Sequence, residues 1–170
     1  GNAGTTIITA TFLILGENVL TYQGGKAVYK KSATDMKSVD FGPGVGKRDV
    51  VRLNLIECES CFVSSEGKLD VETYFGTAPR LWNSLFALMA NAIPQKFLQN
   101  RDAMTKLAVF SMPMIRLIDL FVGSRNSIKV TIETDNGQKR SALMTHDDLE
   151  AAVGDSLSSF VVRMLPSENG

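Results

Sequence analysis

The fold is decided by residues 74–86, which read Tyr74-Phe75-Gly76-Thr77-Ala78-Pro79-Arg80-Leu81-Trp82-Asn83-Ser84-Leu85-Phe86. Before this stretch the sequence patterns mostly predict strands and tight turns, and after it they predict a long helical block. Gly76 ends the preceding strand, Thr77 is a suitable N-cap, and Pro79 suits the first turn of a helix. The stretch therefore predicts the junction at which the chain passes from a sheet to a helical layer.

The residues before this junction predict one helix and several strands. The apolar segment 5–15 fits either a buried helix or a strand, and we favour a helix. Gly24-Gly25 predicts the tight turn of a hairpin over residues 19–31, because two glycines supply the positive φ angles that a two-residue turn needs. Further strands are predicted over residues 50–55 and 69–75.

The residues after the junction predict two long helices. The first carries two apolar stripes and is expected to be largely buried. These stripes are Leu81, Leu85 and Leu88 on one side, and Trp82, Phe86, Met89 and Ile93 on the other. Pro94 ends this helix, and Asn100 caps a second helix that Pro113 breaks or kinks and Gly123 stops.

A second hairpin and a last helix follow. Asp135-Asn136-Gly137 predicts a turn between strands 127–134 and 138–145. Its apolar residues Ile128, Val130 and Ile132 share one side and fit either face of a sheet. Residues 145–148, which begin with Thr145, are close to a capping box and predict the start of the last helix. Gly154 lies within this helix and would let another element pack closely against it.

The composition is that of a globular protein. The chain has 170 residues, enough for one domain, of which 44% are hydrophobic and 21% charged. Its formal net charge of zero argues against a dedicated nucleic-acid binder. Residues 26–52 hold seven Lys or Arg against three Asp or Glu, whereas residues 133–170 hold seven Asp or Glu against three Lys or Arg. This uneven charge fits an ordinary solvated surface or a docking face with charge complementarity.

The sequence predicts an intracellular, reducing environment. The apolar run 7–15 is too short to span a membrane and lacks the features of a signal peptide, so no targeting segment is visible. Two cysteines do not indicate a disulfide scaffold. Cys58 and Cys61, in the weakly patterned segment 58–65, lack the second ligand pair of a zinc site and are expected to be free thiols.

The glycine-rich stretch 42–46 and the single histidine, His146, do not predict a catalytic or cofactor-binding site. Residues 42–46, Gly-Pro-Gly-Val-Gly, differ from a dinucleotide fingerprint in spacing and precede a strand, so they predict a turn. Lys47 and Arg48 could still meet an anion at its edge. His146 is expected in the first turn of the last helix. We therefore predict no catalytic, cofactor-binding or metal-binding residue.

Three stretches in order carry a family resemblance. They are Val39-Asp40-Phe41-Gly42-Pro43-Gly44-Val45-Gly46-Lys47-Arg48, then Tyr74-Phe75-Gly76-Thr77-Ala78-Pro79 with Trp82-Asn83, and Thr145-His146-Asp147-Asp148-Leu149 with Ala152-Val153-Gly154. Together they resemble the C-terminal, non-Rossmann domain of saccharopine dehydrogenase-like oxidoreductases, in a branch seen in cyanobacteria and algae. The resemblance implies a mixed sheet with helices on one face, acting in substrate binding and dimerisation. In that family a preceding Rossmann domain binds NAD(P).

The family's cofactor residues are not carried over, because these 170 residues contain no Rossmann unit. No cofactor is expected for this chain alone, and NAD(P) only if a Rossmann domain is supplied elsewhere. We predict a single α+β domain with a mixed, largely antiparallel sheet and helices packed on one face. The other face of that sheet would need cover from a partner.

Two functions follow from the resemblance. The first is a non-catalytic interaction or scaffold subunit, in a plastid or photosynthetic complex. The alternative is a substrate-binding or dimerisation fragment of a two-domain NAD(P)-dependent oxidoreductase. The expected partner is another protein, a larger complex or a second copy bound through the sheet, and peripheral membrane association is compatible. The residues expected to contact a ligand or partner are Lys47, Arg48, Arg80 and Trp82, since Arg and Trp anchor interfaces.

Overall fold

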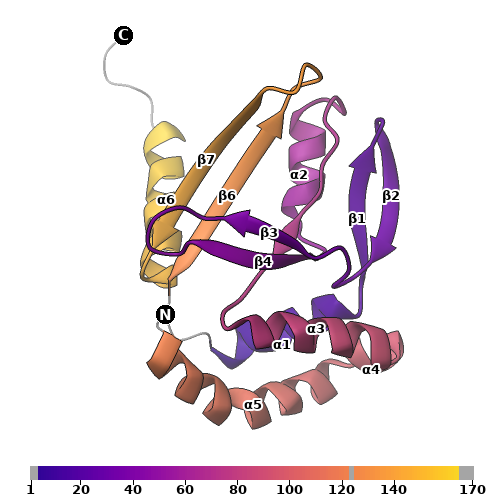
Figure 1. Ribbon diagram of the computed structural model, residues 1–170, viewed down its shortest axis with the longest axis vertical. Helices are drawn as coiled ribbons and strands as arrows, with labels where there is room; N and C mark the ends of the chain where they lie inside the picture. Colours follow the sequence, from indigo (N-terminus) through magenta and orange to yellow (C-terminus); the bar gives the residue numbers. More distant parts are fainter. Residues whose placement is uncertain (1–3, 123–124, 165–170) are drawn as a thin grey trace.

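The computed structural model describes residues 4–122 and 125–164 and has a mixed α+β fold, as predicted. Figure 1 shows a layer of helices below a group of small sheets. The elements are α1 (Thr5–Leu15), β1 (Asn18–Gln23), β2 (Lys26–Lys31), β3 (Lys37–Asp40), β4 (Lys47–Arg52), α2 (Glu57–Ser64), β5 (Tyr74–Phe75), α3 (Arg80–Ala92), α4 (Gln95–Leu98), α5 (Arg101–Val122), β6 (Asn126–Glu133), β7 (Lys139–His146) and α6 (Leu149–Met164).

The strands form three small sheets instead of the single sheet that we predicted. Their orders are β1-β2, β3-β4-β5 and β6-β7, and each pairing is antiparallel. Each hairpin is closed by its own turn and pairs locally. One isolated bridge, between Tyr22 and Val71, links the first hairpin to the segment before β5. The antiparallel pairing was therefore predicted correctly, but the number of sheets was not.

The core lies where the helical layer meets β4. Phe12 of α1 packs edge-on against Phe86 of α3, with ring centroids 6.4 Å apart. Met104 of α5 and Val51 of β4 are fully buried in the same cluster. Because α1 lies against both α3 and α5, the predicted helix over residues 5–15 is confirmed as the central helix of this layer.

Of the helix boundaries that the sequence predicts at Pro94, Asn100 and Pro113, the first two agree with the structure. Pro94 follows α3, and the Asn100 side chain accepts a hydrogen bond of 3.0 Å from the amide of Ala103 at the start of α5. Of the break or kink predicted at Pro113, the break is absent, since α5 runs through Pro113 as one helix. Met112 and Ile115, on either side of Pro113, pack against the core, which supports the helix across the lost backbone hydrogen bond. The stop predicted at Gly123 lies outside the described residues.

Residues 53–75 differ most from the prediction. A helix, α2, occupies most of the weakly patterned segment, where Glu57 and Glu59 lie in its first turn and favour the helix dipole. The strand predicted over residues 69–75 is reduced to Tyr74–Phe75. Val71 bridges to one sheet while Tyr74–Phe75 pair with another, so the segment cannot keep a single ladder.

The predicted C-terminal hairpin is confirmed as β6 and β7, and α6 follows it. The helix is capped by Asp148 and not by Thr145, because Asp148 Oδ1 accepts from the amide of Ala151 at 2.9 Å. His146 therefore ends β7 instead of lying in the helix. The expected close packing at Gly154 is also wrong, since no heavy atom lies within 4 Å of a Cβ placed there.

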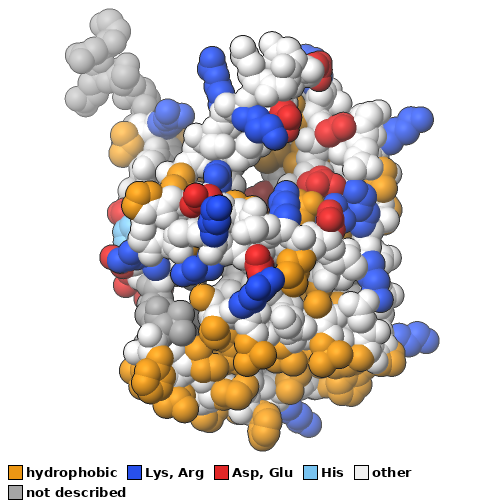
Figure 2. Space-filling view, viewed as in Figure 1, with side chains coloured by type: hydrophobic (Ala, Val, Ile, Leu, Met, Phe, Trp, Pro, Cys, Tyr) orange, Lys and Arg blue, Asp and Glu red, His pale blue; other side chains and the backbone are white. Residues whose placement is uncertain are grey.

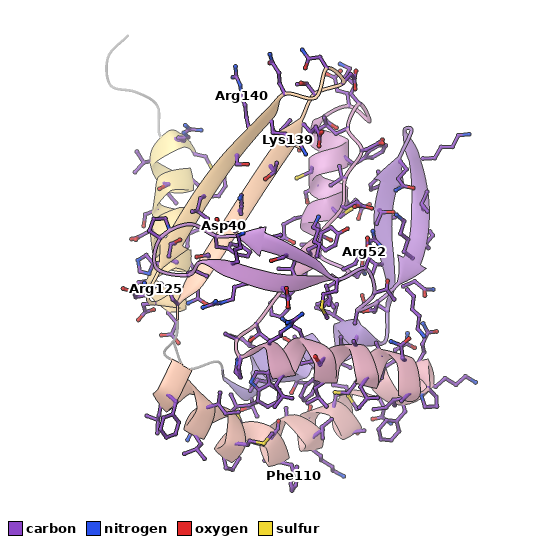
Figure 3. The ribbon with its side chains drawn as sticks, in the orientation of Figure 1. Asp40, Arg52, Phe110, Arg125, Lys139 and Arg140 are labelled. Atoms are coloured by element: carbon purple, nitrogen blue, oxygen red, sulfur yellow. The ribbon has the colours of Figure 1, made fainter. Side chains whose placement is uncertain are left out.

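This C-terminal unit, β6 to α6, meets the rest of the molecule at the β3–β4 turn. Lys129 Nζ donates to the carbonyl of Asp40 at 2.7 Å, and Arg125 donates to the carbonyl of Gly44 at 3.1 Å. Figure 3 shows Arg125 and Asp40 on this side of the molecule. None of the helices within residues 4–122 and 125–164 is both long and apolar enough to cross a membrane.

Candidate functional site

The junction between β5 and α3 is held tightly against β4. A Cβ placed on Gly76 would lie 2.6 Å from the carbonyl oxygen of Asp49, so this position requires glycine. Asn83, which is 1% exposed, donates from Nδ2 to Asp49 O at 2.8 Å and to Thr77 O at 3.3 Å. Its Oδ1 accepts from the amide of Thr77 at 3.0 Å. One buried amide side chain therefore fixes the connection to β4.

The start of α3 carries no side-chain cap. The predicted N-cap, Thr77, lies too early, because the helix begins at Arg80 with Pro79 in the cap position. No acidic residue lies in the first turn. The amides of Arg80 and Leu81 are among the first N–H groups of the helix, which have no acceptor within it. The N-terminus of α3 therefore keeps free donors and an uncompensated positive dipole end.

A surface depression of about 460 Å³ lies at this helix start. It is lined by residues 47–49 and 77–80 together with Ser38 and Asn83. The structure thus brings together three of the four predicted contact residues, Lys47, Arg48 and Arg80. Asp49 is the acidic residue of the lining and pairs with Nε of Arg80. The lining therefore has a formal charge of +2.

The fourth predicted contact residue, Trp82, lies elsewhere. Its side chain is 7% exposed and belongs to the core cluster with Phe86 and Met89. These residues share the inward side of α3, whereas Leu81 and Leu88 of the other stripe are mostly exposed. The expectation that α3 is largely buried is therefore wrong, because Leu81 and Leu88 stay exposed and only Leu85 of that stripe packs against the core.

A buried arginine, Arg52, organises a separate ionic cluster at the end of β4. Its side chain is 7% exposed, and its Nη2 pairs with the carboxylates of Asp35 and of Glu72, the latter at 3.0 Å. Nη2 also lies 3.1 Å from the hydroxyl of Tyr74. Lys37 Nζ lies 3.4 Å above the Tyr74 ring. The cluster joins three segments that are far apart in the sequence (Figure 3 labels Arg52).

The electrostatics of this cluster favour a structural role. Burial, together with hydrogen bonds to Glu72 and Asp35, raises the pKa of Tyr74 to about 12. Burial alone would raise the pKa of Glu72, but hydrogen bonds from Lys30 and Tyr74 and the charge of Arg52 outweigh it and lower that pKa. At neutral pH the phenol is therefore protonated and the carboxylate charged, which suits mutual pairing and not nucleophilic attack.

An apolar surface covers the outer side of the helical layer. On α5 it consists of Phe110, Met114, Leu117 and Phe121, at helical spacing, which we call the outer α5 face. Phe110 is 83% exposed and Phe121 is 84% exposed. Arg116 and Asp119 are the charged residues of the sequence between Phe110 and Phe121. Figure 2 shows a hydrophobic band along the lower edge of the molecule. Figure 3 shows the Phe110 side chain pointing outward from α5, away from the rest of the protein.

The C-terminal unit also exposes apolar side chains. Ile128, Val130 and Ile132 of β6, whose placement the sequence left open, are each more than half exposed. On α6, Leu157 and Phe160 are exposed at helical spacing. The hairpin and α6 therefore leave their apolar residues uncovered within the part of the chain that the structure describes.

The described residues do not fit a dinucleotide. All strand pairings among them are antiparallel, whereas a Rossmann site needs parallel strands and a glycine-rich turn that opens a helix. Residues 42–46 form the predicted turn, which joins β3 to β4 with positive φ at Gly42, Gly44 and Gly46. Across residues 4–122 and 125–164, no three His, Cys, Asp or Glu side chains are grouped for a metal ion.

The two cysteines are free, as expected, but they differ in environment. Cys58 is buried on α2, and its thiol lies 3.1 Å from the carbonyl of Leu20. Burial raises the pKa of the Cys58 thiol, which keeps it protonated and inert at neutral pH. Cys61, one turn later, is exposed. The pair therefore holds one core thiol and one surface thiol.

Sequence reasoning missed the Arg52 cluster and the outer α5 face. Asp35, Arg52 and Glu72 are 17 and 20 residues apart in the sequence, and nothing in their spacing indicates contact. The apolar positions of α5 were visible, but periodicity does not show which side of a helix meets a core. Comparisons of the chain with protein-family models, with curated proteins and with solved structures found no match.

Proposed function

We propose that this chain is a non-catalytic protein-interaction domain whose outer α5 face is covered by a protein partner. The observation that carries the proposal is the pair of exposed phenylalanines, Phe110 and Phe121, on one side of a 22-residue helix. Burying a phenylalanine side chain is worth about 1.5–3 kcal/mol, so this surface has a strong tendency to be covered.

The composition of the outer α5 face supports a protein occupant. The cores of protein interfaces are enriched in aromatic residues and methionine and depleted of charged residues. This face supplies Phe110, Met114 and Phe121, and the sequence from 110 to 121 holds two charged residues, Arg116 and Asp119. Leu81 and Leu88 of α3 are further exposed apolar residues of the helical layer. Contiguous apolar patches of this kind mark interaction sites.

The chemistry of the described side chains supports a non-catalytic role. Burial raises the pKa of the Tyr74 phenol and of the Cys58 thiol, so both groups stay protonated at neutral pH. The charged groups around Arg52 are paired with one another. They are therefore occupied in holding the fold together.

The origin and location of the domain remain part of the proposal. We infer from the sequence resemblance that it derives from the non-Rossmann domain of saccharopine dehydrogenase-like oxidoreductases. The cyanobacterial and algal likeness favours a complex in a plastid, such as a photosynthetic complex. The α+β fold with antiparallel sheets is compatible with this origin.

One observation favours the alternative, a substrate-binding or dimerisation domain of a two-domain oxidoreductase. The depression lined by Lys47, Arg48 and Arg80 is polar and positively charged, as a site for an anionic substrate would be. In that case the apolar surface would be covered by the partner domain or by a second copy.

Measuring the native mass tests the proposed function. The protein is expected in a particle heavier than its own polypeptide, and Phe110→Glu with Phe121→Glu is expected to release it. A native particle of one polypeptide would overturn the proposal.

A further inference from the structure

We propose that the depression between β4 and the start of α3 binds a small organic phosphate, held by Lys47, Arg48 and Arg80. This site lies on a different surface from the outer α5 face, and it holds for either of the functions above. Three independent features converge there: basic side chains, free helix amides, and a polar cavity of suitable size.

The first feature is charge. Lys47 and Arg48 are exposed on β4 and have no ion pair among the described residues. Arg80 pairs with Asp49 through Nε, which leaves its two terminal nitrogens without an ion pair among the described residues, and both side chains belong to the lining of the depression. One carboxylate thus faces three cations. A dianionic phosphate would bring this cluster to neutrality.

The second feature is the N-terminus of α3, a helix of 13 residues. Pro79 supplies no side-chain cap, and the first turn has no acidic residue. The amides of Arg80 and Leu81 therefore need an external acceptor, and phosphate oxygens satisfy such donors at helix N-termini. Asn83 and Gly76 hold this helix start rigidly beside β4, so the donors are placed before a ligand arrives.

The third feature is the cavity itself. Its volume of about 460 Å³ is that of a site for a small molecule. The hydroxyl residues Ser38 and Thr77 belong to its lining, and no aromatic residue does. A nucleobase would lack a stacking surface there. The lining therefore fits a phosphate monoester on a small polar carbon skeleton, such as a sugar phosphate.

The proposal is tested by titrating the ¹⁵N-labelled protein at constant ionic strength with glucose 6-phosphate, inorganic phosphate, glutarate and glucose. The amide signals of Arg80 and Leu81 are expected to shift with both phosphates, with glucose 6-phosphate binding more tightly. Arg48→Gln and Lys47→Gln are each expected to weaken binding about tenfold. Lys26→Gln, which removes the same charge at the β1–β2 turn, is expected to change nothing.

Several results would overturn the proposal. Binding of glutarate as tight as that of glucose 6-phosphate would assign the site to carboxylates instead. Equal weakening by Lys26→Gln would show attraction to net charge alone. Unmoved Arg80 and Leu81 signals in the unmodified protein would exclude the site without any variant. None of these results depends on the outer α5 face, so a failure of the phosphate site would leave the proposed function untouched, and the reverse also holds.

Discussion

The side chain of Asn83 donates a hydrogen bond of 2.8 Å to the backbone carbonyl of Asp49. This bond joins the first turns of α3 to β4 and lies inside the protein. The same amide group satisfies both the N–H and the C=O of Thr77. One polar residue on the buried side of α3 therefore fixes the position of this helix against the β3-β4-β5 sheet, and with it the geometry of the basic depression between them.

Asn83→Ala is expected to destabilise the protein by about 2 kcal/mol. The change leaves the partly buried amide of Thr77 and carbonyl of Asp49 without their Asn83 partner, and a buried unsatisfied group costs about 1–3 kcal/mol. Urea unfolding followed by circular dichroism measures the effect. The control is Asn91→Ala, because Asn91 lies exposed on the same helix. Similar losses for both variants would contradict the role given to Asn83.

Gly76→Ala and Gly154→Ala are expected to change stability in opposite directions. A Cβ at Gly76 meets the backbone of Asp49 at 2.6 Å, so β4 or the junction must move, and we expect a loss of about 1–3 kcal/mol. Gly154 has open space within α6, where alanine stabilises a helix by about 1 kcal/mol. Thermal unfolding compares the variants. A neutral Gly76→Ala would contradict the close contact.

Much of the fold follows from local sequence signals. The hairpins around Gly24-Gly25 and Gly137 form as their turn residues predict, with positive φ at all three glycines. The first has the two-residue turn that such glycines favour, and the second has a longer connection over residues 134–138. The cap at Asn100 and the helix end before Pro94 also follow from single residues. These features depend on a few neighbouring atoms, and the sequence is sufficient to predict them.

The features that were predicted wrongly depend on contacts between distant segments. Val71 pairs with Tyr22 while Tyr74 pairs with Arg52, so alternation over residues 69–75 did not produce one strand. In the candidate site, the sequence singled out Lys47, Arg48 and Arg80, but not their convergence or the burial of Trp82. Both depend on how α3 is turned against the core, and two apolar stripes in the sequence of one helix do not reveal that orientation.

Tyr74→Phe is expected to remove an alkaline loss of stability. The folded pKa of Tyr74, about 12, lies above the ordinary tyrosine value of 10.0, so the contribution of Tyr74 to the unfolding free energy is complete below pH 10 and is lost as pH rises toward 12. Unfolding free energies at pH 9 and pH 11 test this. The unmodified protein should lose more stability over this interval than Tyr74→Phe. Tyr29→Phe, at an exposed site on β2, should behave like the unmodified protein, and an equal loss in all three would contradict the prediction.

The outer α5 face is expected to tolerate charge in the folded chain but not in the complex. Phe110→Glu with Phe121→Glu places two carboxylates on exposed positions, so folding should change little while an apolar interface is disrupted. The matched control is Tyr29→Glu with Val63→Glu, which replaces exposed apolar residues on β2 and α2. Circular dichroism spectra should be the same for all three proteins.

The most direct test is the mass of the particle that contains this protein, isolated from its native source through an affinity tag and measured by native mass spectrometry beside the denatured polypeptide. We predict a particle heavier than one polypeptide for the unmodified protein and for the Tyr29→Glu, Val63→Glu control. For Phe110→Glu with Phe121→Glu we predict a single polypeptide. A single polypeptide in the unmodified protein, or an intact complex in the α5 variant, would contradict the account.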